Sequence, residues 1–274
     1  MTHDIASRVR LNDGREMPMF GLGVWQATPE ETRFAVETAL AEGYRLVDTA
    51  KLYRNEADVG QAVRASGVPR DEVFVTTKLW NADHGYDQTL RAADASARRL
   101  DLGPIDLYLI HYPVPGVRLE SWRALVKLRD DGVARSIGVS NFTVRHLEEL
   151  IQASGVVPAV NQVEFHPFLF QKDLLDYCRA QGIQLQAYCP LTQGMRLGHP
   201  TIVEMAERYG RTPAQILIRW GLQHGVLEIP KSVKAHRIHE NAQVFGWDIA
   251  PEDMAVLDGL NEDLHTSWDP TGEP

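Results

Sequence analysis

Short apolar runs alternate with longer amphipathic stretches along most of the chain. Each run has β-branched or aliphatic residues at consecutive positions, a pattern typical of strands that are buried on both faces of a parallel sheet. We therefore predict eight strands, at residues 20–24, 45–48, 73–77, 105–110, 136–139, 159–161, 184–187 and 226–229.

Helix-start signals occur in the stretches between these runs. Thr28-Pro29 and Thr212-Pro213 each place a capping hydroxyl before a proline that suits the first helical position. Thr143 precedes a stretch with apolar residues at helical spacing. Strands and helices that alternate at intervals of roughly 25–30 residues are typical of βαβ units and a parallel sheet.

Eight such units predict an α/β fold, a (β/α)8 TIM barrel that spans residues 1–274 as a single domain. An open doubly wound sheet is the alternative, and it often has a G-x-G-x-x-G turn after its first strand. Gly21 and Gly23 begin such a turn, but the third glycine is missing, which favours the barrel. Asp13-Gly14, between residues 8–11 and 16–20, predicts a β-hairpin that closes the bottom of the barrel.

Polar or aromatic residues follow almost every predicted strand. Barrel enzymes form their active sites at the carboxyl ends of the strands, so these side chains are expected to converge on one rim. They are Asp48, Lys78, His111, Ser140, Asn141, Asn161, Gln162, Tyr188, Lys231 and Ser232. One such residue is usually structural, but their presence at successive strand ends predicts a functional site.

Proton-transfer chemistry is possible for four residues of this set and its first loop. Asp48 and Lys78 lie on neighbouring strands and are expected to form a buried ion pair, and Tyr53 lies on the loop after Asp48. A neighbouring ammonium lowers the pKa of a tyrosine, so the three residues predict a tuned proton donor. His111 would orient a carbonyl oxygen beside the tyrosine hydroxyl and stabilise negative charge there.

Composition and motifs argue against several other classes. The 274 residues are 44% hydrophobic and 24% charged with a net charge of −9, unlike a disordered chain or a nonspecific nucleic-acid binder. The 10 histidines show no metal-ligand spacing on a helix, so we predict no metal site. No apolar run is long enough to span a bilayer, and residues 1–10 have no apolar core of a signal peptide. Cys178 and Cys189 suit two reduced thiols in a cytoplasmic protein.

Several of these motifs together resemble the aldo-keto reductase superfamily. The resemblance runs from about residue 9 to residue 258, with the family's signature regions in the same order. The chain is similar to short bacterial members of the 2,5-diketo-D-gluconate reductase type, which reduce keto-sugars and α-dicarbonyls. The matching segments are residues 43–56 (GYRLVDTAKLYRNE), 76–80 (TTKLW), 105–111 (IDLYLIH), 138–142 (GVSNF) and 229–233 (IPKSV), the last continuing to Arg237 and Glu240-Asn241.

The resemblance implies a barrel enzyme that reduces carbonyl groups with NADPH. Tyr53 would donate the proton, Lys78 paired with Asp48 would lower its pKa, and His111 would position the substrate carbonyl. The cofactor contacts that the resemblance implies are the Gly23 and Val24 backbone, Ser140, Asn141 and Gln162 at the nicotinamide amide, Tyr188 at its ring, Leu191 at the diphosphate, Lys231, Ser232 and Arg237 at the 2′-phosphate, and Glu240 and Asn241 at the adenine. Val233 is a further expected cofactor contact.

A local cluster of cations supports the 2′-phosphate assignment on physical grounds. Lys231, Lys234 and Arg237, with His236 among them, form a basic cluster in an acidic chain. A dianionic phosphate needs cations, and arginine offers two parallel donors. The region after the last strand is also where barrels often bind phosphate. We therefore predict NADPH in preference to NADH.

Large aromatic side chains are expected to surround the substrate. The loop of residues 112–117 is short, which favours an open pocket and broad specificity for small aldehydes and ketones. The expected pocket residues are Trp25, Trp80, His111 and Tyr112, with Asn81 beside them. Lys51 is expected to face water, and Trp268 in the C-terminal tail either covers the pocket or packs outside it.

Two other functions stay open at this point. One is a barrel that binds the cofactor without turnover, and the other is a lyase or aldolase that uses Lys78 as a Schiff base. The complete set of Asp48, Tyr53, Lys78 and His111 favours the reductase. The chain has no exposed apolar heptad, so we predict a monomer whose partner is a small carbonyl substrate, with no nucleic acid and no membrane.

Overall fold

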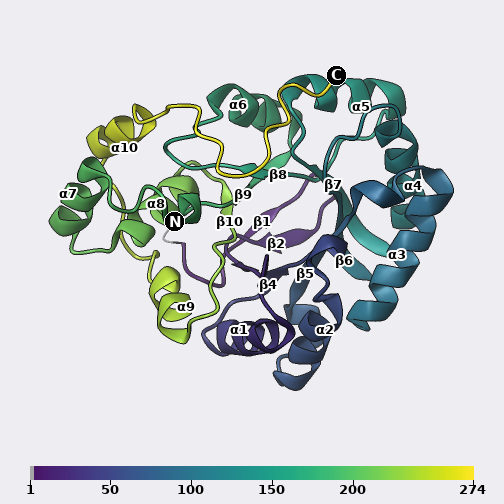
Figure 1. Ribbon diagram of the computed structural model, residues 1–274, viewed down its shortest axis with the longest axis horizontal. Coiled ribbons are helices and arrows are strands. Elements are labelled where there is room, and N and C mark those ends of the chain that lie inside the picture. The colour runs from purple at the N-terminus through teal and green to yellow at the C-terminus, as the bar shows by residue number, and fades with distance from the viewer. Residues whose placement is uncertain (1–2) are drawn as a thin grey trace.

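In residues 3–274, which the computed structural model describes, eight parallel strands pair in chain order to form the central sheet (Figure 1). Parallel bridges from Phe20 to Glu228 and from Gly23 to Lys231 join the first strand to the last. The sheet is therefore a closed barrel, and the predicted (β/α)8 fold is confirmed. Its strands are β3 (Leu22–Gly23), β4 (Leu46–Asp48), β5 (Phe74–Leu79), β6 (Ile105–Ile110), β7 (Ala134–Ser140), β8 (Val160–Glu164), β9 (Gln184–Tyr188) and β10 (Leu227–Glu228).

Helices surround the barrel and cover the outer face of the strands (Figure 1). Because the strands pack against helices outside and against each other inside, every residue of β5 and β6 is buried. The helices are α1 (Pro29–Ala41), α2 (Glu56–Ala65), α3 (Tyr86–Leu100), α4 (Arg118–Asp130), α5 (Val144–Ser154), α6 (Lys172–Gln181), α7 (Pro200–Tyr209), α8 (Pro213–Gln223), α9 (Ala235–Ala242) and α10 (Pro251–Asp258). None of the helices in the described residues is long and apolar enough to cross a membrane.

The predicted helix starts at Thr28, Thr143 and Thr212 are confirmed, and each has a capping box. The Thr28 hydroxyl accepts from the Glu31 backbone N–H at 3.3 Å, while Glu31 Oε2 accepts from the Thr28 backbone N–H at 2.9 Å. Thr212 and Gln215 make the same reciprocal pair at the start of α8. These bonds satisfy backbone donors that have no partner inside the helix, so they fix where α1 and α8 begin.

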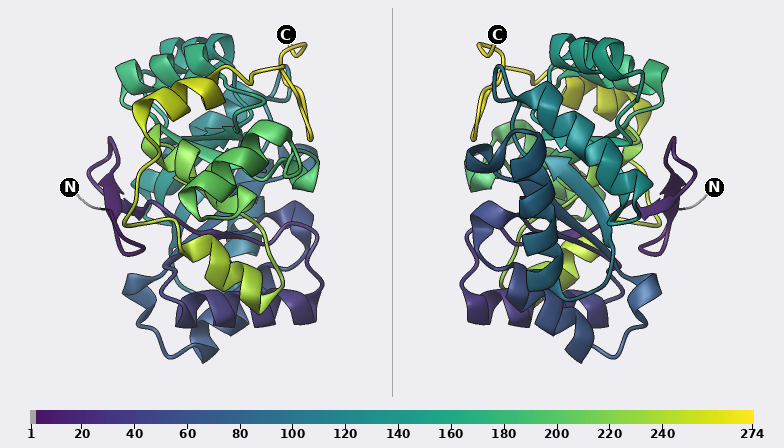
Figure 2. Two further views of the ribbon diagram at one scale, coloured as in Figure 1. Left: turned by 90° about the vertical axis from the view of Figure 1, so that its left-hand side faces the viewer. Right: turned by 90° about the vertical axis from the view of Figure 1, so that its right-hand side faces the viewer.

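The predicted N-terminal hairpin is confirmed, with strands β1 (Arg8–Arg10) and β2 (Glu16–Pro18). Its turn includes Gly14 with φ of 86°, a conformation that glycine adopts without strain. Asn12 Nδ2 donates to the Pro158 carbonyl at 2.9 Å, just before β8 begins. The hairpin therefore covers the amino ends of the barrel strands, at the opposite end of the molecule from the C-terminal segment (Figure 2).

Four strands, β5, β7, β8 and β9, extend further than the apolar runs predicted, and β5 and β8 do so at the carboxyl ends by two and three residues. β5 continues through Lys78 to Leu79, and β8 continues to Glu164, where Glu164 pairs with Tyr188 of β9. An apolar run ends at the first polar residue, whereas a strand continues while its backbone stays in the ladder. Inside a barrel, polar side chains that face the axis do not end the strand. The strand predicted to end at residue 161 therefore ended too early.

Candidate active site

A buried chain of hydrogen bonds joins Asp48, Lys78 and Tyr53. Lys78 Nζ lies 2.5 Å from Asp48 Oδ1, and it also donates to the Thr49 carbonyl at 3.0 Å and to the Tyr53 hydroxyl at 3.2 Å. Gln162 Nε2 donates to the other Asp48 oxygen at 2.7 Å. A buried ion pair needs good geometry and satisfied neighbours, and this pair has both. The predicted buried pair of Asp48 and Lys78 is therefore present.

The local structure places these side chains on one rim. Asp48 is the last residue of β4 and pairs with Thr76 of β5, so Lys78, two residues further along β5, points to the same face as Thr76. Tyr53 ends the 3₁₀ helix η1 (Lys51–Tyr53), and Arg54 follows it in the left-handed conformation with φ of 60°. This sharp turn brings the tyrosine back over the end of β5.

Burial dominates the acid–base properties of this cluster. It lowers the pKa of Lys78, against the opposing attraction of Asp48. It raises the pKa of Tyr53 well above its ordinary value, and the Asp48 charge raises this pKa further. Burial sets the direction of the overall shift, so the predicted lowering of the Tyr53 pKa by Lys78 stays a prediction. Tyr53 is protonated at neutral pH.

His111 lies directly after β6 and beside Tyr53, with ring centroids 5.7 Å apart. Burial, together with the charge of Lys78, holds the pKa of His111 well below its ordinary value. The imidazole is therefore neutral at neutral pH and has one N–H to donate. His111 Nδ1 is buried and has no hydrogen-bond partner in the described part of the chain.

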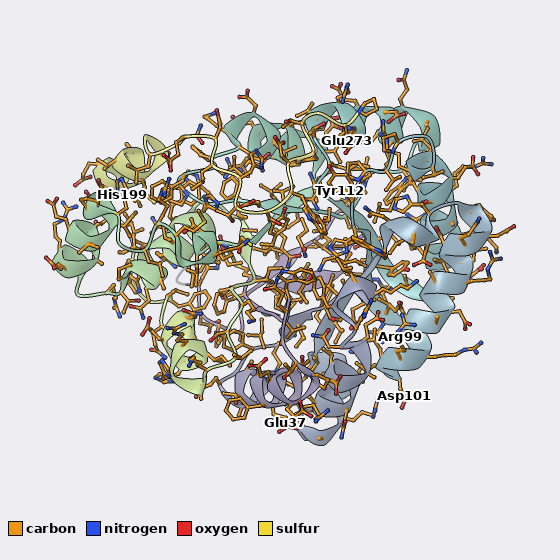
Figure 3. All side chains as sticks on the ribbon, viewed as in Figure 1. Glu37, Arg99, Asp101, Tyr112, His199 and Glu273 are labelled. Carbon is orange, nitrogen blue, oxygen red and sulfur yellow. The ribbon has the colours of Figure 1, made fainter. Side chains whose placement is uncertain are left out.

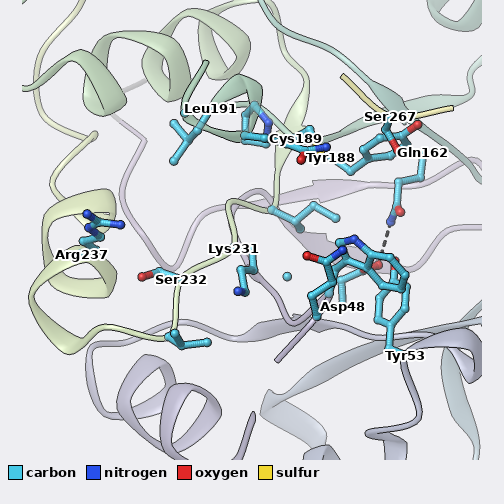
Figure 4. Close-up of a pocket in the computed structure, with 18 of the residues that line it drawn as sticks. Asp48, Tyr53, Gln162, Tyr188, Cys189, Leu191, Lys231, Ser232, Arg237 and Ser267 are labelled. Atoms are coloured by element: carbon cyan, nitrogen blue, oxygen red, sulfur yellow. Dashed lines mark hydrogen bonds between the residues drawn. The ribbon is translucent and has the colours of Figure 1, made fainter. Parts of the chain in front are cut away.

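A cavity of about 420 Å³ extends from Tyr53 and His111 to Arg237 (Figure 4). A cavity of this size with several converging polar groups is the typical form of a small-molecule site. Lys78 does not line it, and its Nζ is fully occupied by the three acceptors described above. Since a Schiff-base lysine must reach its substrate, this geometry does not suit the lyase alternative.

Most of the predicted cofactor residues line this cavity, namely Gly23, Asn141, Gln162, Tyr188, Leu191, Lys231, Ser232, Val233 and Arg237. Val24, Ser140, Glu240 and Asn241 do not line it. The Ser140 hydroxyl donates to the Gln162 carbonyl at 2.7 Å, so it supports the wall. Glu240 Oε1 accepts from the Thr212 hydroxyl at 2.9 Å, so it contributes to the contact between α9 and α8.

The far end of the cavity is cationic. Lys231, Lys234 and Arg237 line it and are exposed, and Ser232 lies between them in the chain. Among the described residues that line the cavity, Asp48 is the only acidic one, and Lys78 neutralises it. This end of the cavity therefore suits a phosphate group.

Asn141 is held in place by the protein itself. It adopts a left-handed conformation with φ of 65°, which asparagine tolerates better than most residues. Its Nδ2 donates to the His111 carbonyl at 2.9 Å and to the Ser140 hydroxyl at 3.2 Å, and its Oδ1 accepts from the Tyr188 hydroxyl at 2.7 Å. The Asn141 amide thus fixes the Tyr188 ring at the cavity wall.

The C-terminal strap, which we define as residues 265–274, covers part of the cavity. Ser267 and Trp268 line the cavity. The Trp268 ring lies 5.2 Å from the His111 ring and 5.9 Å from the Trp80 ring, measured between centroids. Of the two placements that the sequence left open for Trp268, the structure has the one that covers the pocket.

Glu164 holds the strap, and sequence reasoning missed it. This buried carboxylate accepts from the backbone N–H groups of Thr266 at 2.9 Å and Ser267 at 3.0 Å, from the Thr266 hydroxyl, and from His166 Nε2 at 3.1 Å. The predicted strand ended at residue 161, so the sequence did not place Glu164 at the rim of the barrel.

The end of the strap is fixed by Tyr112 and Arg118. The Tyr112 hydroxyl donates to Glu273 Oε1 at 3.0 Å, and the two side chains lie together in Figure 3. Arg118 Nη1 donates to the Pro274 carbonyl at 2.7 Å. The strap is therefore bound to the barrel at both of its ends, with Trp268 between them.

The predicted substrate residues differ in how close they lie to the cavity. Trp25 lines it and packs on Tyr53 with ring centroids 4.7 Å apart. Trp80 and Tyr112 do not line it but contact Trp268, and Asn81 begins the 3₁₀ helix η3 (Asn81–Asp83). Lys51 does not line the cavity, and its partly exposed side chain forms an ion pair with Asp83.

Several lining residues had no signal in the sequence. Most of them belong to the loop after β9, and the irregular sequence of this loop does not show where its side chains lie. They are Gln26, Cys189, Pro190, Gln193, Gly194 and Leu197.

Comparisons with known proteins show which family the chain belongs to. A glyoxal reductase of Bacillus subtilis (strain 168) is 49% identical over 271 residues, covering 98% of each chain. A morphine 6-dehydrogenase of Pseudomonas putida is 46% identical, covering 96% of this chain and 94% of that protein. A solved structure of a Gox0644 variant in complex with NADPH has a TM-score of 0.93 at 44% identity, covering 98% of each chain. The model of the Aldo/keto reductase family matches residues 17–262, and the chain belongs to this family of oxidoreductases.

Proposed function

We propose that this aldo/keto reductase uses NADPH to reduce small aldehydes and ketones, keto-sugars and α-dicarbonyls among them, to alcohols. The observation that carries the proposal is the Tyr53 hydroxyl. It lies 3.2 Å from Lys78 Nζ, and Tyr53 lines the cavity beside a neutral His111. NADPH, when bound, supplies the hydride that carbonyl reduction requires.

Tyr53 supplies the proton to the carbonyl oxygen. Its raised pKa keeps the phenol protonated until the reaction. When the proton leaves, the Lys78 ammonium donates a hydrogen bond to the phenolic oxygen and stabilises the phenolate. Asp48 favours the charged form of Lys78 through the buried ion pair. A phenol with such a high pKa releases its proton only when negative charge develops on the neighbouring carbonyl oxygen.

His111 positions the substrate. A neutral imidazole with one N–H donates a hydrogen bond to the carbonyl oxygen, next to the Tyr53 hydroxyl. Trp25 and Trp268 form the apolar walls around this point. A cavity bounded by aromatic rings on its sides and by polar groups at its base suits small carbonyl compounds with apolar or neutral substituents.

The rest of the cavity fits NADPH. Lys231, Ser232 and Arg237 at the cationic end would hold the 2′-phosphate, and the arginine fork would donate two parallel hydrogen bonds. Gln162 and the Tyr188 ring would hold the nicotinamide at the end near Tyr53. This fit is supported by the charge of the lining. Among the described lining residues Asp48 is the one carboxylate, and its ion pair with Lys78 leaves no acidic group to repel an anionic cofactor.

The test is a panel of carbonyl compounds with the purified protein. NADPH oxidation is followed by absorbance with an α-dicarbonyl, a keto-sugar and an aromatic aldehyde, and each assay is repeated with NADH. We expect turnover with several compounds and a clear preference for NADPH. Tight NADPH binding without any turnover would support the binding-protein alternative and would overturn the proposed reaction.

A further inference from the structure

Gln186 lies inside the barrel, behind the cavity wall. It is in register with Gln162 on the neighbouring parallel strand, so the two side chains point to the same face of the sheet. Gln186 is 0% exposed and does not line the cavity, whereas Gln162 does. Gln162 Nε2 donates to Gln186 Oε1 at 2.8 Å. Gln186 therefore contacts the site only through Gln162.

The hydrogen bonds fix which way the Gln162 amide is turned. An ionised carboxylate only accepts hydrogen bonds, so the Gln162 atom that lies 2.7 Å from Asp48 Oδ2 is the nitrogen. The second N–H of the same nitrogen goes to Gln186. Both donors of Gln162 are thus occupied within the protein.

The Gln162 amide oxygen is left for a ligand. Within residues 3–274 it has no hydrogen-bond partner, and Gln162 lines the cavity. The neighbouring Asn141 amide and Ser140 hydroxyl are occupied by the protein. Gln162 Oε1 is therefore the side-chain acceptor that this part of the wall offers.

Gln186 is held at a cost to the fold. Its Nε2 is buried without a partner among the described residues. A buried donor that makes no hydrogen bond is destabilising, and an apolar side chain of similar size would avoid the penalty. The acceptor that Gln186 provides to Gln162 is a function that an apolar side chain would not supply.

We propose that Gln186 is a positioning residue for the cofactor. It holds the Gln162 amide so that Oε1 faces the cavity and accepts a hydrogen bond from the carboxamide N–H of the nicotinamide. This inference rests on the proposed function, because the carboxamide belongs to the proposed cofactor. Without Gln186, the second N–H of Gln162 loses its acceptor, and the amide is no longer held in one orientation.

The test compares two dinucleotides that differ in the carboxamide alone. NADP⁺ carries the N–H donors, and its 3-acetylpyridine analogue has a methyl ketone in their place. Dissociation constants are measured by the quenching of protein fluorescence, so turnover is not needed. We expect the unaltered protein to bind NADP⁺ about five- to tenfold more tightly than the analogue, the effect of one hydrogen bond of ordinary strength.

Gln186→Leu is expected to bring this ratio to within about twofold of unity, by weakening NADP⁺ and leaving the analogue almost unchanged. Gln184→Leu is the matched control, because Gln184 lies on the same strand but donates to the Leu185 and Gly225 carbonyls. It is expected to keep the full ratio. Gln186→Met removes the acceptor with a more adaptable side chain and gives the same test if the leucine variant does not fold.

An unchanged ratio in the Gln186 variants, with both dinucleotides still bound, would overturn the positioning role and leave the proposed function intact. Failure of the unaltered protein to bind either dinucleotide would overturn the proposed function itself. The two failures are therefore distinct.

Discussion

The two ends of the cavity hold their charges in opposite ways. At the end near Tyr53, Asp48 and Lys78 are buried at 2% and 0% exposure and satisfy each other within the protein. At the cationic end, Lys231 and Arg237 are exposed and line the cavity. A buried charge must be paired where the chain folds, whereas an exposed one is stable in water without a partner. The charges near Tyr53 are thus paired by folding, whereas those of the cationic end stay available to a ligand.

This difference predicts different consequences for substitutions at the two ends. A change in the buried cluster should affect turnover and the free energy of unfolding together, because both depend on the same hydrogen bonds. A change in the exposed cluster should affect the choice of dinucleotide and leave stability almost unchanged.

The largest effect is expected from Lys78→Met. This change leaves Asp48 buried without its cation, which should lower the free energy of unfolding by about 3–5 kcal/mol. It also removes the donor to the Tyr53 phenolate, so kcat should fall by about 10²- to 10³-fold. Steady-state kinetics and denaturant unfolding measure the two effects. Lys51→Met is the control, because Lys51 is paired with Asp83 outside the cavity and should change kcat by less than about twofold.

The next effect concerns the cationic end. Lys231→Gly combined with Arg237→His should weaken NADPH binding by about 10- to 100-fold, because charge-assisted hydrogen bonds to the 2′-phosphate are lost. NADH, which lacks that phosphate, is the internal control and should change by less than about threefold. Equal loss for both dinucleotides, measured by fluorescence titration, would remove the 2′-phosphate role.

A buried glutamate, Glu228, sharpens the contrast between paired and unpaired charge. Glu228 is buried, and neither of its carboxyl oxygens has a hydrogen-bond partner among the described residues. Burial raises the pKa of Glu228 well above its ordinary value. The folded protein therefore keeps a proton that the unfolded chain has released above the ordinary carboxyl pKa. Stability should fall as the pH rises through this window, by about 1.4 kcal/mol per pH unit for one proton.

Glu228→Gln should remove this pH-dependent contribution to stability, because glutamine does not titrate. The slope of unfolding free energy against pH is measured between about pH 5 and pH 7. It should become less negative by about 1.4 kcal/mol per pH unit, the contribution of one proton. The variant should also be more stable than the unaltered protein at neutral pH. An unchanged slope would show that Glu228 is ionised in the folded state.

The smallest effect is expected at the strap. Trp268→Ala removes an aromatic ring that would contact an aromatic substrate beside His111. Such a contact is worth about 0.5–1.5 kcal/mol. The KM for an aromatic aldehyde should therefore rise by about two- to tenfold, while kcat changes less. Phe34→Ala, which truncates an exposed aromatic ring on α1, is the control and should leave KM unchanged. A Trp268 variant with the same KM as the control would place the strap outside the substrate site.

The sequence allowed the barrel and the buried cluster to be predicted because both follow from periodic patterns. Apolar runs marked the strands, and Asp48, Lys78 and His111 stand at or near their carboxyl ends. The roles of Glu164 and Gln186 were not predictable in this way. Their contacts connect residues of different strands, or of a strand and the distant tail, and no local pattern encodes such pairs. The effect of burial on the Tyr53 pKa was not predictable either, because burial is a property of the folded chain.

The most direct test of the proposed mechanism is Tyr53→Phe, measured by kcat for carbonyl reduction and by the dissociation constant for NADPH in the same preparation. We expect kcat to fall by at least about 10²-fold, the usual contribution of a general acid, because the ring remains and its proton is lost. NADPH binding should stay within about twofold, since the cationic end is untouched. Turnover close to that of the unaltered protein would contradict the assignment of Tyr53 as the proton donor.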